Sequence, residues 1–134
     1  ITLVTYGSTW RIVTDAANQL ERSGISCEVI DTQTLVPFDL THDISESVKK
    51  TNRLLVIDED VPGGASAYIL QNIIEEQDAY NYLDSEPQTL AAKAHRPPYG
   101  KDGDYFSKPS ADDVFEKVYG MMNEVNPSKF PSLY

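Results

Sequence analysis

The residue types most able to do chemistry gather in one acidic segment followed by a glycine pair: Asp58, Glu59 and Asp60, then Gly63 and Gly64. The glycines open a predicted helix, whose first N–H groups attract anions, but the neighbouring carboxylates would repel a phosphate. We therefore expect an acidic side chain to cap the helix, with contact to a basic partner as the second interpretation. A divalent cation ranks third, because consecutive side chains on an extended chain point in alternate directions and rarely converge.

A second candidate segment is the loop that contains Arg96 and Tyr99, stiffened by two prolines between them. Arg and Tyr are favoured anchors at protein interfaces. Contact with a partner protein and a plain surface loop are equally consistent with this segment. His42 and His95 stand far apart, and neither has a metal-ligand pattern around it.

Known motifs of catalysis are missing from the sequence. The turn after the first predicted strand, Tyr6–Thr9, lacks the G-x-G-x-x-G glycines and the Walker lysine. There is no G-x-S-x-G elbow, no catalytic Cys/His arrangement and no zinc spacing. The motifs alone therefore predict an α/β domain without an active site.

Charge and cysteine usage narrow the class of protein. The chain has 134 residues, with 21 acidic and 11 basic side chains and a net charge of -10. This balance disfavours nucleic acid and anionic membranes, which need Lys and Arg to replace counterions. The single cysteine, Cys27, excludes an intramolecular disulfide and is expected to be a buried thiol. With no membrane span and no signal-peptide pattern, we expect a cytoplasmic or otherwise reducing location.

Strand-like and helix-like segments alternate along the chain. Strands are predicted at Ile1–Tyr6, Ile25–Ile30, Arg53–Asp58 and, more weakly, Gln88–Ala94. Helices are predicted from Ser8 or Thr9 to Gly24, from a cap at Asp39 or Thr41 through Val48, over Ala65–Gln77, and after a capping box of Ser110 and Asp113. The alternation predicts a three-layer α/β/α fold with a mostly parallel sheet of about five strands. The pattern is also compatible with one edge strand that runs antiparallel to the others.

One domain is expected over residues 1–125, followed by an extended tail at 126–134. A long loop at His95–Pro109 separates the last strand from the last helix. The chain opens directly in an apolar segment without an initiator Met, which we expect of a domain cut from a longer polypeptide.

Two blocks of sequence point to a family. The first comprises ITLVTYG at 1–7 and GISCEVIDTQTLVPFD at 24–39; the second comprises VKKT at 48–51, RLLVIDE at 53–59 and the glycine pair. These blocks resemble the transketolase C-terminal domain, and more narrowly the version in the beta subunit of 2-oxo acid dehydrogenase decarboxylating components. The resemblance is good from Ile1 to about Ile74 and fades afterwards.

The resemblance implies an assembly role. In such enzymes, thiamine diphosphate and magnesium lie between two other domains, so this domain is expected to bind neither and to be inactive alone. It would pack in a dimer or heterotetramer and help to dock the acyltransferase core. The parent would decarboxylate pyruvate or a branched-chain 2-oxo acid and reductively acylate a lipoyl group. Catalytic, cofactor-binding and metal residues are not expected; the structural or interface candidates are Asp31, Leu35, Pro37, Asp39, Asp58, Glu59, Asp60, Gly63, Gly64, Arg96, Tyr99 and Tyr134.

Two alternatives remain. One is the matching domain of a transketolase or deoxyxylulose-phosphate synthase, although the residues at Thr34–Pro37 and at Lys50-Thr51 favour the dehydrogenase. The other is a free-standing flavodoxin-like binding module. Such a module needs a phosphate loop or an acidic pocket, for which Asp58–Asp60 is the only candidate.

Overall fold

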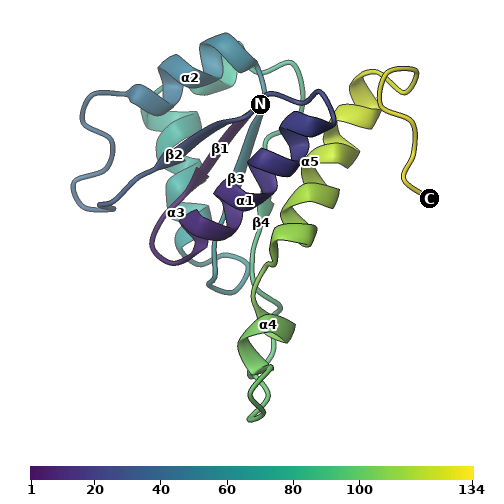
Figure 1. The fold of residues 1–134 in the computed structure, drawn as a ribbon. Helices are drawn as coiled ribbons and strands as arrows, with labels where there is room; N and C mark the ends of the chain where they lie inside the picture. The colour runs from purple at the N-terminus through teal and green to yellow at the C-terminus, as the bar shows by residue number, and fades with distance from the viewer.

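Four short parallel strands form the centre of the fold in the computed structural model, which describes residues 1–134 (Figure 1). They are β1 (Thr2–Thr5), β2 (Glu28–Asp31), β3 (Leu54–Ile57) and β4 (Gln88–Leu90), in the order β2-β1-β3-β4. The predicted α/β class and parallel sheet are confirmed. The expected count of about five strands was too high, because the chain beyond β4 contains no further apolar run and turns to helix instead.

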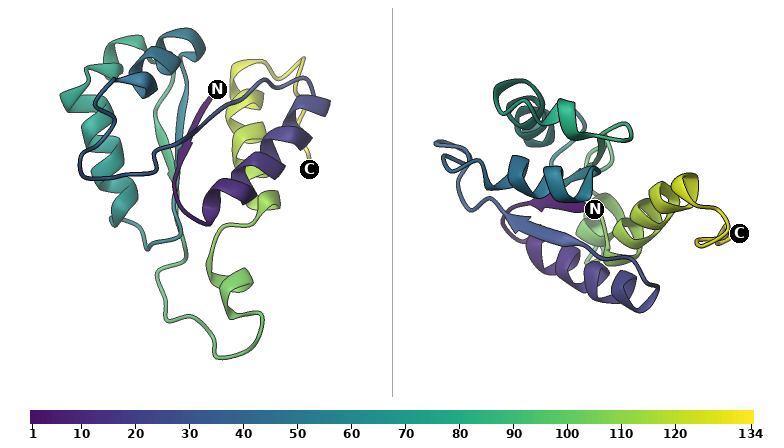
Figure 2. Two further views of the ribbon diagram at one scale, coloured as in Figure 1. Left: turned by 60° about the vertical axis from the view of Figure 1, so that its left-hand side comes forward. Right: turned by 90° about the horizontal axis from the view of Figure 1, so that it is seen from above.

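Helices cover both faces of the sheet (Figure 2). One layer contains α1 (Thr9–Arg22) and α5 (Ala111–Val125); the other contains α2 (Asp43–Thr51) and α3 (Ala65–Gln71), which continues as a π-helical turn at Asn72–Glu76. A 3₁₀ turn at Ala79–Tyr82 and the short helix α4 (Gly103–Ser107) complete the set. None of these helices combines the length and the apolar character that crossing a bilayer requires.

Alternate residues of each strand supply two separate cores. Leu3 and Leu55 pack with α1 and α5, whereas Val4 and Val56 pack with α2 and α3. Every residue of β1 and β3 is buried. Burial on both faces explains why Arg53–Asp58 reads as an almost unbroken apolar run in the sequence.

Local signals placed most helix ends correctly. Gly24 follows α1 with φ of 77°, and Ile25 N–H donates to the carbonyl of Leu20, which closes the helix as predicted. At α5, Ser110 and Asp113 form the predicted capping box. Strand β2 begins later than predicted, because its register with β1 starts only at the pair Thr2↔Glu28.

Residues 95–106, here called the arm, project from the body beyond the end of β4 (Figure 1). The arm was predicted as plain loop but contains most of α4. Its base is closed by a 2.9 Å hydrogen bond from Lys93 N–H to the carbonyl of Ser107. The expected extended tail is also partly folded: residues 127–130 turn back, and Phe130 is buried against the α1/α5 core.

Candidate functional site

The carboxylate of Asp58 is fully buried at the end of β3 and accepts three hydrogen bonds. The Tyr6 hydroxyl donates to Oδ1 at 2.7 Å, and the N–H of Asp60 donates to the same oxygen at 3.1 Å. The N–H of Ser66, in the first turn of α3, donates to Oδ2 at 3.0 Å. Asp58 therefore caps α3 from within the core and ties the start of that helix to strands β1 and β3.

The glycine pair shapes the turn between Asp58 and α3. Gly63 has a φ of 88°, a backbone conformation that residues other than glycine rarely adopt. Gly64 is the residue before the helix, and a Cβ added there would lie 2.2 Å from Oδ2 of Asp60. The second glycine is needed because the Asp60 side chain turns back over it and accepts a hydrogen bond from Val61 N–H at 2.8 Å.

Glu59 points toward different partners. Its Oε2 accepts from Ser8 Oγ at 2.8 Å and from Lys108 Nζ at 3.1 Å. These hydrogen bonds, that of Ser8 first, hold the pKa of Glu59 below its usual value, and the bond to Glu59 raises the pKa of Lys108. Glu59 thus connects the loop after β1 to the base of the arm.

The three acidic side chains do not converge. Asp58 is satisfied by Tyr6 and backbone N–H groups, Glu59 by Ser8 and Lys108, and Asp60 by Val61. No group of three or more His, Cys, Asp or Glu side chains is arranged to hold a metal ion.

The pKa of Tyr6 is raised, mainly by burial of its hydroxyl and next by its hydrogen bond to Asp58, so Tyr6 stays protonated.

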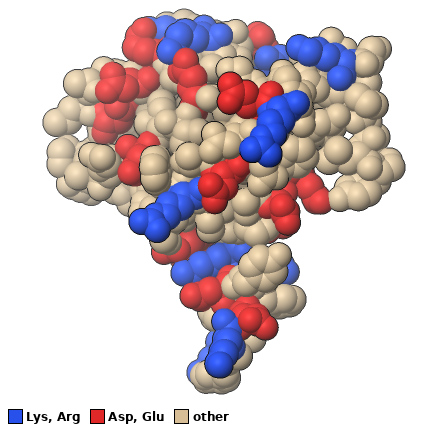
Figure 3. All heavy atoms as spheres, in the orientation of Figure 1, with Lys and Arg blue, Asp and Glu red and all other residues tan.

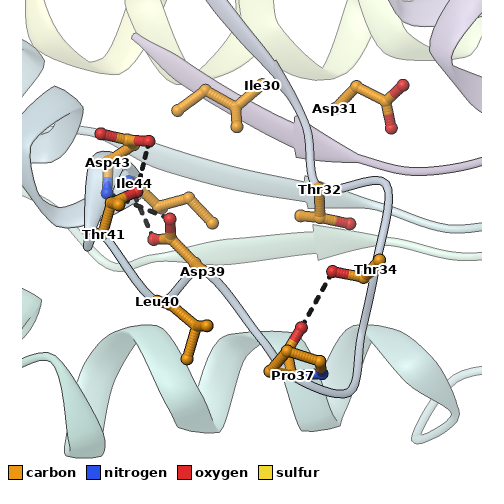
Figure 4. A pocket seen from close by; sticks show the side chains of 10 residues that line it. All are labelled: Ile30, Asp31, Thr32, Thr34, Pro37, Asp39, Leu40, Thr41, Asp43 and Ile44. Carbon is orange, nitrogen blue, oxygen red and sulfur yellow. Dashed lines mark hydrogen bonds between the residues drawn. The ribbon is translucent and has the colours of Figure 1, made fainter.

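A hollow of about 280 Å³ lies beside the loop that follows β2 (Figure 4). Three carboxylates line it, those of Asp31, Asp39 and Asp43. Asp39 caps α2: its two oxygens accept from the N–H groups of Asp43 and Ile44, each at 3.0 Å. Of the two predicted caps, Asp39 is therefore the one used.

Leu35 and Pro37 support the same loop. The Leu35 carbonyl accepts a 2.9 Å hydrogen bond from the hydroxyl of Tyr68 on α3, and Thr34 Oγ1 donates to the Pro37 carbonyl at 2.9 Å. The Tyr68 ring also meets Phe38 edge to face, with centroids 6.1 Å apart. The loop is held against α3 by these contacts, while the side chains of Val36 and Leu40 stay exposed.

The remaining candidates lie apart from these two sites. Arg96 stacks over the ring of Tyr99 on the exposed arm, 4.7 Å from its centroid. Tyr134 lies at the end of the chain, where its hydroxyl donates to Glu116 Oε1, and this bond raises its pKa. Asp58, Glu59, Asp60 and the glycine pair share one turn, although their side chains point to different partners. Asp31, Pro37 and Asp39 line one hollow, which is separate from that turn.

The model for the family described as "Transketolase, C-terminal domain" matches residues 1–114. The chain belongs to the transketolase C-terminal domain family. The recognition made from the sequence is confirmed. All but the last 20 residues of this transketolase C-terminal domain lie within the match.

Two curated relatives of this transketolase C-terminal domain are beta subunits of pyruvate dehydrogenase E1 components. The pyruvate dehydrogenase E1 component subunit beta of Rickettsia conorii is 39% identical over 119 residues, which is 88% of this chain and 36% of that protein. The subunit of the same name from Rhizobium meliloti is 34% identical over 117 residues, 87% of this chain and 25% of that protein. The chain thus spans about a third of the length of the first of these relatives.

A solved structure shares the fold of this transketolase C-terminal domain. It is described as "Split gene transketolase, inactive beta4 tetramer" and superposes with a TM-score of 0.66 at 21% identity. The likeness covers 89% of this chain and 37% of the solved one. The expected transketolase C-terminal-like architecture is confirmed by this likeness.

Proposed function

We propose that this chain is the C-terminal assembly and partner-docking domain of a thiamine-diphosphate-dependent 2-oxo acid dehydrogenase. The main support is the family match over residues 1–114, together with 39% identity to a pyruvate dehydrogenase E1 beta subunit. In this proposal the parent oxidatively decarboxylates pyruvate or a branched-chain 2-oxo acid and passes the acyl group to a lipoyl group. The parent works as a dimer or heterotetramer in the cytoplasm.

Thiamine diphosphate and magnesium belong, in this proposal, to other parts of the parent enzyme. A diphosphate does not fit the residues of this chain. The start of α3 is already capped by the Asp58 carboxylate, with Glu59 and Asp60 beside it. The hollow beside the β2 loop is lined by three further carboxylates, which would repel an anion.

The docking partner that suits this chain is basic. The net charge of -10 favours association with Lys- and Arg-rich segments and accelerates their encounter at low salt. Asp60 is exposed at the carboxyl end of β3 and makes no ion pair, so its charge is free for a partner. We propose that Asp60 and its neighbours meet a basic segment of the acyltransferase core.

The deciding assay uses the full-length parent with any separate partner subunit. Oxidative decarboxylation of pyruvate and of branched-chain 2-oxo acids is followed with an artificial electron acceptor, with and without thiamine diphosphate. We expect cofactor-dependent turnover of one of these substrate classes. Lack of turnover with every 2-oxo acid would reject the proposal and favour ketose-phosphate transfer or synthesis, the activities of the transketolase alternative.

Docking is tested separately by titrating the parent with the isolated acyltransferase core. Asp60→Lys is expected to weaken binding at low salt, because it places a cation opposite a basic partner. Glu76→Lys is the matched control, since Glu76 is also exposed but lies at the end of the π-helical turn after α3. Equal losses in both variants would show a general charge effect and exclude Asp60 as a contact.

A further inference from the structure

A chain of buried hydroxyl groups lies at the amino edge of the sheet, opposite the edge from which the arm projects. Thr2, the first residue of β1, has no exposed surface. Its Oγ1 lies 2.7 Å from Ser47 Oγ and 2.7 Å from Thr51 Oγ1. Ser47 and Thr51 are four residues apart on α2 and therefore share one face of that helix. The three hydroxyls thus fasten α2 to the first strand from within the protein.

The hydroxyl chain ends at the carboxylate of Glu28, the first residue of β2 and the register partner of Thr2. Glu28 Oε2 accepts a hydrogen bond from Ser47 Oγ, and Glu28 Oε1 pairs with Lys50 Nζ at 2.7 Å. The side chain of Glu28 is 39% exposed and that of Lys50 is 65% exposed. Figure 3 shows acidic and basic side chains next to one another along the top of the molecule, where α2 lies in Figure 1. Protons from solvent can therefore reach one end of a chain that is otherwise buried.

Ionised Glu28 sets the direction of the protons in this chain. A carboxylate can only accept, so Ser47 donates to Glu28, and the Ser47 oxygen is left to accept from Thr2. The Thr2 oxygen then accepts from Thr51, which lies nearer to it than to its other acceptor, the Arg53 carbonyl at 3.2 Å. Hydrogen bonds aligned in one direction polarise and strengthen one another.

Protonation of Glu28 removes the charge that holds this arrangement. The ion pair with Lys50 loses its negative partner, and Ser47 faces a neutral group, which is a weaker acceptor. The bond from Lys50, followed by that from Ser47, lowers the pKa of Glu28. The contribution is therefore complete above the ordinary 4.5 and is lost as the pH falls through the lowered pKa. The charged groups that face Glu28 are Lys50 Nζ and the α-amino group of Ile1, and both favour the carboxylate.

The end of α2 also holds residues 79–84, which follow the π-helical turn. Asn52, directly after α2, donates from Nδ2 to the Tyr82 carbonyl at 2.8 Å. The Asn52 carbonyl accepts from the N–H of Asp84 at 3.0 Å. The side chain of Asp84 is exposed and forms no ion pair. The position of this exposed carboxylate therefore depends on the end of α2.

We propose that Glu28 and the hydroxyl chain form a proton-sensitive latch on the C-terminal end of α2. When Glu28 is ionised, the latch holds this end of the helix against β1 and β2 and fixes residues 79–84. When Glu28 is protonated, the end of α2 and residues 79–84 open together more often, while α1 keeps its protection. The latch acts within this domain and does not depend on the activity of the parent.

Amide hydrogen exchange, followed by NMR from about pH 6 down to about pH 3, tests the latch. The 134-residue chain is suitable, because both of its cores close within it. Acetylation of the N-terminus removes the charge of Ile1 and leaves Lys50 as the cation that faces Glu28. The reporters are the N–H groups of Asn52 and Asp84, with rates corrected for the intrinsic effect of pH. We expect their opening to rise about fivefold as Glu28 is protonated, which is the size of one partly exposed ion pair.

Three variants separate the latch from general loosening in acid. Glu28→Gln cannot ionise, so its two reporters should open more often at every pH and lose their pH dependence. Glu46→Gln is the matched control, because Glu46 pairs with Lys49 on the same helix but touches none of the three hydroxyls, so the pH dependence should persist. Thr2→Val keeps the ion pair of Glu28 but interrupts the chain, and it should raise opening at neutral pH. A cooperative thermal transition verifies that each variant folds.

Several results would overturn the proposal. Reporters whose protection stays constant over the whole pH range would do so. Unchanged pH dependence in Glu28→Gln would assign the effect to a different carboxylate. An equal rise in opening across α1 would show that acid loosens the whole domain and that no local latch exists. The decarboxylation assay is independent of all these outcomes, so the proposed function would stand or fall separately.

Discussion

The hydroxyl of Tyr6 donates a 2.7 Å hydrogen bond to Oδ1 of Asp58, and this bond joins the residues that directly follow strands β1 and β3. Asp58 has no exposed surface, so the hydrogen bonds that its carboxylate accepts come entirely from donors within the protein. Tyr6 is the one side chain among the three donors; the other two are the backbone N–H groups of Asp60 and Ser66.

Removing the Tyr6 hydroxyl should therefore destabilise the domain. Tyr6→Phe leaves a buried carboxylate short of one donor, which typically costs about 1–3 kcal/mol in the free energy of unfolding. Urea unfolding at neutral pH measures the change. Tyr80→Phe is the control, because Tyr80 is 68% exposed and should tolerate the change. Equal stability of the two variants would mean that the hydroxyl bond contributes nothing.

Asp39 and Thr41 should differ sharply as caps of α2. Asp39 accepts two backbone N–H bonds from the first turn of the helix, whereas Thr41 donates only to the Asp43 side chain. Asp39→Ala is expected to lower the free energy of unfolding by about 1–2 kcal/mol, and Thr41→Ala to change it by less than about 0.5 kcal/mol. Thermal or urea unfolding of both variants measures these changes. A larger loss of stability in Thr41→Ala than in Asp39→Ala would contradict the assignment of Asp39 as the cap.

Gly64 and Asp60 should be energetically coupled. Gly64→Ala places a methyl group within 2.2 Å of the Asp60 carboxylate and 2.6 Å of its Cγ, so the side chain must move and lose its bond to Val61. We expect a loss of about 1–3 kcal/mol. In the background Asp60→Ala the same change should cost much less, since the crowding atoms are gone. Strict additivity in this double-mutant cycle would rule out the steric explanation.

The ion pair between Glu59 and Lys108 should make a small, pH-dependent contribution. Both side chains are 37% exposed, so solvent screens the pair and Lys108→Met is expected to cost less than about 1 kcal/mol at neutral pH. The folded-state pKa of Glu59 lies below its ordinary 4.5, so the contribution is present above 4.5 and is lost as the pH falls through the lowered value.

The check is the difference in stability between Lys108→Met and the unmodified chain, measured from pH 7 down to about pH 3. The difference should shrink toward zero at the acidic end. Lys101→Met serves as control, because Lys101 is exposed on the arm and forms no ion pair. A difference that stays constant across this range would exclude the carboxylate of Glu59 as its source.

Sequence reasoning was accurate where a local pattern carries the physics. Strand β3 is buried on both faces, so its apolar run was visible, and the helix ends at Gly24 and Ser110 follow from backbone geometry that those residues favour. Helix α4 was missed because five residues among prolines and glycines show no helical period. The start of β2 was misplaced because pairing with β1, and not its own residues, sets where it begins.

For the candidate site, too, sequence reasoning found the local contact and missed the long-range ones. An acidic residue before a helix predicts a cap, and Asp58 occupies that position. Its partner Tyr6 and the Glu59 partners Ser8 and Lys108 carried no signal, because these contacts join residues 52, 51 and 49 positions apart. The bonds of Tyr6 and Ser8 arise because the parallel strands β1 and β3 bring their carboxyl ends to one edge of the sheet. Lys108 reaches Glu59 because the chain returns there from the arm.

The outer strands of the sheet are short, which protects this protein from edge-to-edge pairing when many copies are close together. An open sheet edge is a template on which a foreign strand can grow. Strand β4 has only three residues and follows Pro87, while β2 begins and ends with the carboxylates of Glu28 and Asp31. Neither edge offers the long, flat, uncharged row that fibril-like polymerisation needs, so many copies can be held close together without their sheets fusing.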